Sequence, residues 1–151
     1  MTYPPEGDVW DPPWNEPDVI EEFRAHAGQV PSFNSKHPFL LLTTTGRRSG
    51  RPRTNPMTYQ EHHGELFVFA SKGGFPKHPD WYLNLVASPR VTVEIGQETF
   101  AATARVLEGN ERSEVFTRQI EQLPEMADYD ARTERVIPVI ALDRVGGTRT
   151  A

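Results

Sequence analysis

The sequence predicts a mainly β protein with flanking helices (α+β), in which about six strands form a mostly antiparallel sheet that closes on itself. Short runs of apolar and β-branched residues recur along the chain, as expected for strands. Tight hairpin turns join most of these runs, which favours antiparallel neighbours. No internal repeat and no second domain is visible, so a single sheet would build the core.

Length and composition also indicate one compact domain. The chain has 151 residues and a composition typical of soluble globular proteins. We expect an N-terminal arm with a short helix over 1–37, a single barrel domain over 38–145 and a disordered tail over 146–151. No apolar run approaches the roughly 20 residues of a membrane span, and no signal peptide is recognisable, so we expect a cytoplasmic protein.

Charge and cysteine content exclude several classes of function. The net charge is −5, which argues against bulk binding to nucleic acid or to an anionic membrane. The chain has no cysteine, so disulfides, thiolate metal sites and cysteine nucleophiles are excluded.

The N-terminal region predicts an extended arm followed by one amphipathic helix. Proline is frequent over 1–17, which favours irregular, extended backbone. Asn15 and Pro17 give a helix start, and Gly28 gives a stop. The apolar face of this helix carries Val19, Ile20, Phe23 and Ala27. We expect this face to pack on the domain, with a lid over a ligand or a weak membrane contact as the alternatives.

Six strands and three further helices follow in the pattern. The strands are expected at 39–45, 54–59, 66–70, 91–95, 100–106 and 136–142. The helices are expected from 79 to near Ser88-Pro89, at 110–122 and at about 126–132. His62-His63-Gly64 and Gly96-Gln97 are expected turns. Pro56 interrupts the second strand, which indicates a sheet edge or a place where a ligand meets the backbone. The last strand is expected to be buried apart from Pro138.

The first candidate binding segment is the turn after the first strand, Gly46–Arg53. It holds four arginines within eight residues, although the protein is acidic overall. Arginine binds phosphate and carboxylate groups in a bidentate way, and glycine lets the backbone approach a ligand. We therefore expect a local pocket for an anion here. The alternative is a solvated, arginine-rich hairpin turn.

The second candidate segment is Ser71-Lys72-Gly73-Gly74, at the end of a predicted buried strand. Backbone N–H groups of a glycine-rich turn, together with a lysine, can hold a phosphate. The predicted helix start at Asp80 and Trp81 is close in sequence. The two anion-binding segments leave strands that we expect to be adjacent, which favours a shared site over a simple flexible loop. Trp81 and Tyr82 would then wall a ligand pocket or, alternatively, belong to the core.

Other common site patterns are absent from the sequence. Gly46–Gly50 is followed by neither a Gly-Lys-Ser/Thr ending nor a helix, which excludes a P-loop and a dinucleotide fingerprint. The five histidines lack the spacing of a helical metalloprotease site, so no metal is expected. Ser49 and Ser71 lack a nucleophile-elbow context, which leaves a hydrolase triad unsupported.

Four segments, in the same order, resemble the motifs of the deazaflavin-dependent nitroreductase family of actinobacteria. They are LLTTTGRRSGRPR at 41–53, FASKGG at 69–74, PDWYLNL at 79–85 and TERVIPV at 133–139. The resemblance extends from about Phe39 to Leu142. It implies a split β-barrel related to flavin-binding oxidoreductases, and coenzyme F-420 with its anionic phospholactyl-oligoglutamate tail as the cofactor.

The resemblance also implies roles for individual residues. Arg47, Arg48, Ser49 and Arg53 would hold the phosphate and the tail, and Asn55, Pro56, Met57 and Thr58 would lie along the deazaflavin ring. Ala70, Ser71 and Lys72 would contact the ring edge and the phosphate, while Trp81 and Asn84 would complete the pocket. The implied reaction is hydride transfer from the reduced deazaflavin to an electron-poor acceptor, such as a nitroaromatic compound, a quinone or an enone.

One segment departs from the family pattern. Where the family's nitroreductase has several pocket tyrosines, this chain has Leu123 and Met126, and only Tyr129 remains. We expect Met126 and Tyr129 to line a changed substrate pocket, with Ser71 and Tyr129 as the hydroxyls that orient substrate or relay a proton.

Three functions remain open on these grounds. They are an F-420-dependent reductase, a split-barrel oxidoreductase that uses FMN, and a non-catalytic deazaflavin-binding protein. The dense arginine turn favours the more anionic cofactor, since FMN carries one phosphate. The sequence leaves open whether the protein is a monomer or a homodimer, and whether it touches the inner face of the membrane.

Overall fold

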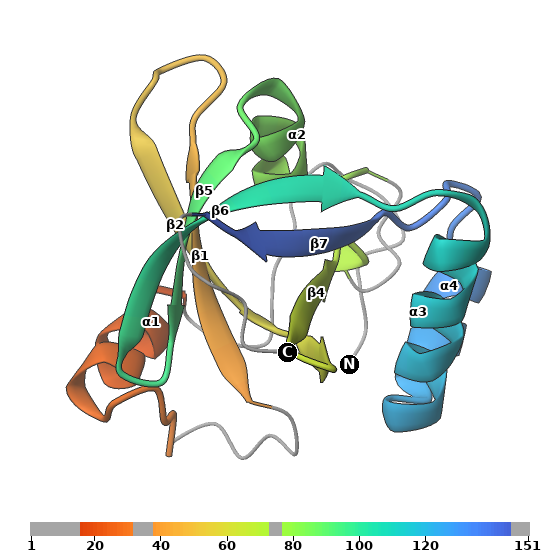
Figure 1. Cartoon of the computed structure of the whole chain (residues 1–151), viewed down its shortest axis with the longest axis horizontal. Coiled ribbons are helices and arrows are strands. Elements are labelled where there is room, and N and C mark those ends of the chain that lie inside the picture. The colour runs from red at the N-terminus through yellow and green to blue at the C-terminus, as the bar shows by residue number, and fades with distance from the viewer. Residues whose placement is uncertain (1–15, 32–37, 73–76, 146–151) are drawn as a thin grey trace.

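A computed structural model describes residues 16–31, 38–72 and 77–145. The expected arm over 1–15, its capping Asn15, the glycines Gly73 and Gly74 and the tail over 146–151 lie outside the described residues. Figure 1 shows the arrangement of the elements.

The described residues form one seven-stranded sheet in which every neighbouring pair is antiparallel. The strands are β1 (Phe39–Thr45), β2 (Pro52–Thr58), β3 (Gln60–His62), β4 (Glu65–Phe69), β5 (Arg90–Ile95), β6 (Glu98–Val106) and β7 (Val139–Arg144). Their order is β2-β1-β5-β6-β7-β4-β3. The predicted fold class is therefore confirmed, with one strand more than expected.

The sheet closes because its two edge strands are consecutive in the chain. β2 and β3 lie at opposite ends of the strand order, yet only Tyr59 separates them. The sheet must therefore curl until its edges meet, which gives the split barrel. The expectation of six strands missed β3, because three residues before the His63-Gly64 turn carry too little pattern to identify a strand. The turn itself is present, with positive φ at both residues.

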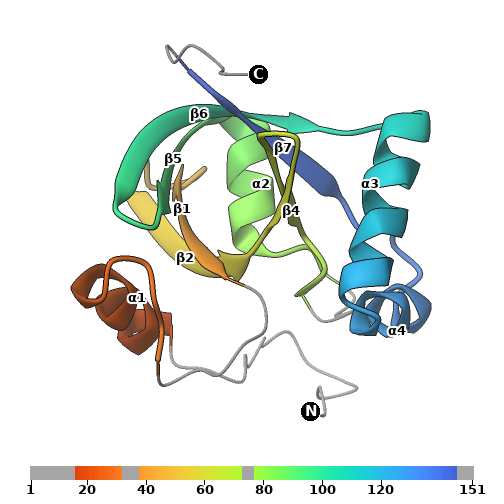
Figure 2. The same ribbon diagram turned by 60° about the horizontal axis from the view of Figure 1, so that its bottom comes forward.

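The inner face of the barrel holds the main apolar core. Alternate side chains of the strands point inward, and Leu85 of helix α2 (Asp80–Ala87) packs among them. The buried members are Leu40, Leu42, Leu66, Val68, Ala70, Leu85, Val91, Val93, Ala102, Ala104, Ile140 and Leu142. In Figure 2, α2 lies between the other helices, across the barrel. The buried Leu85 therefore anchors α2 to the barrel core.

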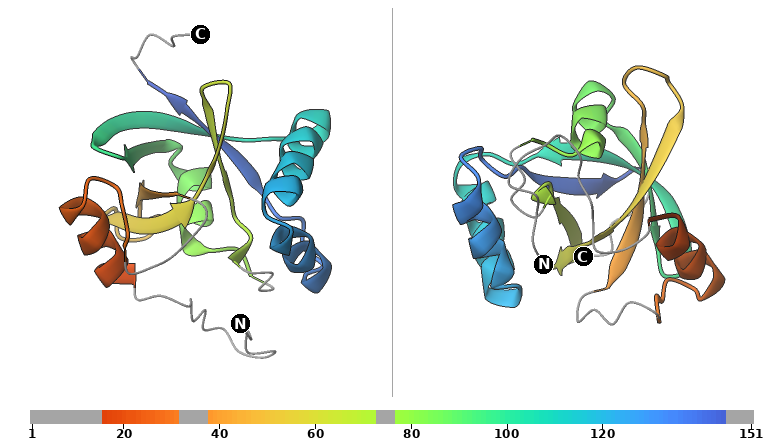
Figure 3. Two further views of the ribbon diagram at one scale, coloured as in Figure 1. Left: turned by 90° about the horizontal axis from the view of Figure 1, so that it is seen from below. Right: turned by 180° about the vertical axis from the view of Figure 1, so that it is seen from behind.

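The outer face of the sheet is covered at opposite ends of the molecule, as Figures 1 and 3 show. At one end, Phe23 of α1 (Glu16–Ala25) packs on Phe39 and Leu41, which confirms that this helix packs on the domain. The Arg24 guanidinium also donates to both Glu94 carboxylate oxygens, at 3.0 and 2.8 Å. None of the described helices is long and apolar enough to span a membrane.

At the other end, helices α3 (Gly109–Gln122) and α4 (Glu125–Arg132) cover β4 and β7. Val115 and Phe116 of α3 and Met126 of α4 pack against Phe67 and Ala141. A buried polar contact joins this layer to β3, where the Gln60 side-chain amide donates to Gln119 Oε1 at 2.9 Å. That contact fixes the short edge strand against α3.

The last strand begins at Val139, three residues later than predicted. Pro138 cannot donate to the sheet, so pairing starts after it. The expectation that Pro138 would be exposed was wrong, because it is buried and its carbonyl accepts from the Ala70 N–H at 3.0 Å. Val136, by contrast, is 68% exposed.

Candidate functional site

A cavity of about 620 Å³ lies between the turn after β1 and the first half of α2. Its lining comes from two parts of the chain that are more than twenty residues apart. The lining residues are Gly46, Arg47, Arg48, Ser49, Pro52, Arg53, Thr54, Asn55, Asp80, Trp81 and Asn84. We call this cavity the arginine groove.

The turn that forms one wall is fixed by its own hydrogen bonds. The Gly46 N–H donates to the Arg51 carbonyl and the Gly50 N–H to the Gly46 carbonyl, both at 2.8 Å. The Arg51 N–H donates to Ser49 Oγ at 3.1 Å. A Cβ at Gly46 would lie 2.7 Å from that Ser49 oxygen, so a larger residue there would displace the Ser49 side chain from its contact with Arg51. The arginines therefore extend from a rigid backbone.

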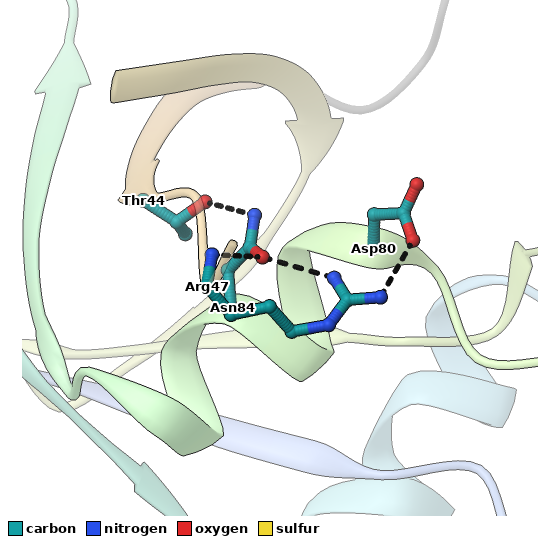
Figure 4. Close-up of polar contacts among 4 residues, drawn as sticks. All are labelled: Thr44, Arg47, Asp80 and Asn84. Carbon is teal, nitrogen blue, oxygen red and sulfur yellow. Dashed lines mark hydrogen bonds and ion pairs between the residues drawn. The ribbon is translucent and has the colours of Figure 1, made fainter. Parts of the chain in front are cut away.

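Asn84 joins the turn to α2, as Figure 4 shows. It is 4% exposed, and its Oδ1 accepts from the Arg47 backbone N–H at 3.1 Å and from Arg47 Nη1 at 3.0 Å. Its Nδ2 donates to Thr44 Oγ1 at 3.2 Å. Asp80 holds the other side of the Arg47 guanidinium, with Nη2 and Oδ1 3.4 Å apart. Arg47 is thereby positioned before any ligand arrives.

The charge of the groove is positive. Its lining contains three arginines and one acid, Asp80, which is paired with Arg47 and 86% exposed. Arg48 and Arg53 are exposed, and within residues 16–31, 38–72 and 77–145 neither has a carboxylate partner. Uncompensated guanidinium groups beside a rigid turn suit a phosphate or carboxylate ligand.

The edge strand β2 forms a second wall, and its side chains alternate between the two faces. Asn55 pairs with Leu42 and Met57 with Leu40, so both share the inner face with the barrel core. Pro56 and Thr58 pair with Leu41 and Phe39 on the outer face, toward α1. Of the four residues expected along the ring, only Asn55 lines the groove. Pro56 does lie in an edge strand, as its missing N–H requires.

The corner after β4, residues 70–72, lies outside the groove lining but is electrostatically linked to it. Lys72 is half-buried and has a φ of +46°, in the left-handed region. Burial lowers the pKa of the Lys72 ammonium, Arg135 and Lys77 lower it further, and Asp80 raises it. Because Asp80 also lines the groove, Lys72 adds positive charge near the same end of α2.

The two candidate anion-binding segments leave β1 and β4, which are not hydrogen-bonded neighbours. The expectation of adjacent strands was wrong for that reason, since β5, β6 and β7 lie between them in the sheet. The helix α2 instead connects the segments, through Asn84 on one side and Asp80 on the other.

Met126, Leu123 and Tyr129 lie in the helical layer over β4 and β7, apart from the groove lining. Met126 is 3% exposed and belongs to the apolar cluster with Phe116 and Ile137. Tyr129 is half-buried against the same cluster, and the Arg132 guanidinium lies 6.0 Å from its ring centre. Tyr129 is thus the more accessible of the two expected pocket residues.

Sequence reasoning assigned no role to Arg135, Thr44 or His78. Arg135 donates to the carbonyl of Ser71 at 2.7 Å, and Thr44 accepts from the buried Asn84. Arg135 did stand within segment 133–139, but the partners of its guanidinium, Ala70, Ser71 and His78, are 57 to 65 residues away in the chain. Only the tertiary structure shows them.

Comparisons with known proteins agree with this geometry. The family model for the F420H(2)-dependent quinone reductases matches residues 18–144, where F420H(2) is the reduced form of coenzyme F-420. An F420H(2)-dependent quinone reductase of Mycobacterium tuberculosis is 37% identical over 110 residues, which cover 71% of this chain and 74% of that protein.

Solved structures show the same relationship. An F420-H2 dependent reductase is 43% identical, with a TM-score of 0.65 over 70% of this chain and 94% of that one. A domain-swapped dimer is 38% identical, with a TM-score of 0.67 over 82% of this chain and 94% of that one. The family-model match covers most of the chain, and the arginine groove is present in the fold. This chain therefore belongs to the F420H(2)-dependent quinone reductase family.

Proposed function

We propose that this protein binds coenzyme F-420 in the arginine groove and uses its reduced form to reduce a quinone. The observation that carries the proposal is a pair of exposed arginines that line the groove, Arg48 on the turn held by Asn84 and Arg53 at the start of β2. Such a site suits a ligand with several negative charges, and the phospholactyl-oligoglutamate tail is of that kind.

The residues present fit this cofactor by charge and by shape. A groove of about 620 Å³ with uncompensated guanidinium groups leads to β2, which is an edge strand of the described sheet and pairs only with β1. Arg47, Arg48, Ser49 and Arg53 would hold the phosphate and tail, with Lys72 as a further cation. Trp81 and Asn55 would border the ring.

When bound, the reduced deazaflavin supplies a hydride to the acceptor. The chain's own residues position the anionic tail and orient the ring, and they stabilise the negative charge that develops on the quinone oxygen. Reduction of a quinone to a hydroquinone takes one hydride and one proton. We propose the hydroxyl of Ser71 or Tyr129, or a water held by one of them, as the source of that proton.

The substrate side of the proposal rests on Tyr129. Met126 is buried beneath the surface of the helical layer, so it would support the pocket floor while Tyr129 meets the acceptor. Quinones, nitroaromatics and enones are all electron-poor, and the family membership favours the quinone. We propose a cytoplasmic protein that works as a monomer or homodimer. Because quinones partition into membranes, we also propose peripheral contact with the inner leaflet, which vesicle cosedimentation would test.

The decisive experiment is a titration of the purified protein with oxidised F-420 and, in parallel, with FMN, followed by fluorescence. We expect F-420 to bind selectively. Arg53→Ala and Lys72→Ala should each weaken F-420 binding by about tenfold or more. Arg51→Ala is the matched control, since Arg51 is exposed on the same turn but does not line the groove. It should bind within about twofold of the parent.

Three other results would separate the alternatives. Preference for FMN would favour the FMN-dependent oxidoreductase. Tight F-420 binding without reduction of menadione, enones or nitroaromatics would favour a non-catalytic binding protein. Parental affinity in both Arg53→Ala and Lys72→Ala would show that the groove is not the cofactor site.

A further inference from the structure

Arg135 makes several polar contacts at the end of β4. Its guanidinium lies half-buried and donates to two successive backbone carbonyls, to Ser71 from Nη2 at 2.7 Å and to Ala70 from Nη1 at 3.0 Å. Nη1 also lies 3.2 Å from Nδ1 of His78. The planar fork of arginine can make these contacts together, and the single ammonium of lysine cannot.

The contact with Arg135 determines which nitrogen of His78 carries the proton. A guanidinium has donors only, so Nδ1 of His78 must accept, and the proton of the neutral ring sits on Nε2. The ring of His78 packs against Tyr82, with ring centres 4.8 Å apart. Burial lowers the pKa of His78, and the charge of Arg135 lowers it further. The neutral ring is therefore the form that fits this contact.

The backbone that Arg135 holds is in an unfavourable conformation. Lys72 has a φ of +46°, in the left-handed region that a residue with a Cβ seldom adopts. On the other side of the corner, the Ala70 N–H donates to the Pro138 carbonyl at 3.0 Å. The corner is thus fixed at its N–H by Pro138 and at its carbonyls by Arg135, directly before the lysine.

We propose that Arg135 and His78 form a positioning clamp that holds residues 70–72 so that the Lys72 ammonium faces the anionic part of the bound cofactor, and that the clamp opens when His78 takes up a proton. This proposal rests on the proposed function, because it assigns the cofactor to the arginine groove. A protonated His78 would present an N–H to the Arg135 N–H and add a like charge, so the contact would become repulsive.

Among the residues that the structure describes, Arg135 and Tyr82 are the charged and titratable groups that contact His78. Arg135 faces it from the segment before β7, and Tyr82 faces it from α2. Lys77 and Asp80 are its near neighbours in sequence. Arg135 is the charge that acts on the pKa of His78, so protonation of that ring reports mainly on the clamp.

The test measures the Kd for oxidised F-420 between about pH 8 and pH 5 in three variants of the full chain. His78→Asn keeps an acceptor near the Nδ1 position but does not titrate. We expect parental affinity at pH 8. Between pH 8 and pH 5, the affinity of the parent should fall about tenfold more than the affinity of His78→Asn. Ionisation of the coenzyme itself is common to both proteins. Arg135→Lys should weaken binding about tenfold at pH 8 and approach the parent at pH 5, where the parental clamp is open. The surface variant Arg105→Lys should match the parent at every pH.

An independent readout uses the protein without cofactor. Imidazole ¹⁵N NMR should show His78 with the proton on Nε2 at neutral pH, and its pKa should rise in Arg135→Gln, which removes the neighbouring positive charge. The opposite tautomer, or parental pH dependence in His78→Asn, would overturn the clamp. If neither the parent nor Arg53→Ala binds F-420, the proposed function fails. If the parent binds and Arg135→Lys binds equally well, the clamp alone fails.

Discussion

The arginine groove and the helical layer formed by α3 and α4 are held together by different forces. In the groove, the buried Asn84 organises Arg47 through hydrogen bonds, and exposed guanidinium groups remain at the surface. In the helical layer, Met126 and Ile137 are almost fully buried in an apolar cluster. The groove is built to meet a charged ligand, whereas the layer is built chiefly by excluding water.

This difference distinguishes residues that determine ligand affinity from residues that determine folding stability. Exposed charges contribute little to folding, so groove arginines can change affinity while stability stays the same. A buried apolar side chain contributes mainly to folding, so its loss should leave the groove intact. Asn84 is the exception, because it belongs to the groove and is also buried.

The largest expected effect is on stability, from Met126→Ala. Removing this 3% exposed side chain should lower the free energy of unfolding by about 3 kcal/mol, because a cavity remains in the cluster. Urea denaturation measures the loss. Val136→Ala is the control, since Val136 is 68% exposed and its truncation should cost about 0.5 kcal/mol or less.

The same Met126→Ala protein should bind F-420 with parental affinity if the two regions are independent. A parallel loss of affinity would show instead that the helical layer and the groove are coupled.

The next largest effect is expected from Asn84→Leu. This change removes the acceptor of two Arg47 donors and the donor to Thr44, so stability should fall by about 2 kcal/mol. Affinity for F-420 should fall about tenfold, because the turn loses its link to α2. Both are measured on one preparation, by urea denaturation and by fluorescence titration.

Asn84→Asp is the informative partner of that variant. A carboxylate keeps the acceptor for Arg47, and the Thr44 hydroxyl can donate to it, so stability should stay within about 1 kcal/mol of the parent. Binding should still weaken, because the added charge neutralises Arg47. Parental stability and affinity in Asn84→Leu would mean that this network does not hold the turn.

Local features of the sequence predicted much of this architecture. The run at Phe39–Thr45 is continuously apolar or β-branched, and β1 has the predicted bounds. The turn after β1 was predicted from its glycines, and its preference for an anion was inferred from its arginines. Barrel closure was harder, because β3 is only Gln60–His62 and is fixed by pairing with β4 and by Gln60 contacts with α3.

Site contacts between distant residues could not be predicted. Arg135 donates to the carbonyl of Ser71, 64 positions away, and no local pattern indicates such a pair. Met126 shows the same limit differently. An apolar residue on an amphipathic helix has the same sequence pattern whether it meets the core or a ligand, and only its burial distinguishes the two.

A smaller effect should appear in the salt dependence of binding. Arg48 is exposed, so its attraction to an anionic tail is screened by salt. Arg48→Ala should weaken F-420 binding about threefold to fivefold at low ionic strength, and the difference should shrink in high salt. Met126→Ala should keep the parental salt slope. An unchanged slope in Arg48→Ala would remove this arginine from the site.

The smallest effect is a pH dependence of stability that comes from His78. Burial and Arg135 lower its pKa in the folded protein, whereas an unfolded chain has a histidine pKa of about 6.5. Above that pH both states are neutral at this residue, and it adds no pH dependence. Below it, the unfolded chain binds a proton that the folded protein refuses, so the free energy of unfolding falls until the folded pKa is reached. His78→Asn should therefore lose less stability than the parent between about pH 7 and pH 5, as urea denaturation at several pH values would measure. Equal losses of stability in the two proteins would mean that His78 has the same pKa in the folded and unfolded states. Protonation of His78 would then have no effect on how residues 70–72 are held.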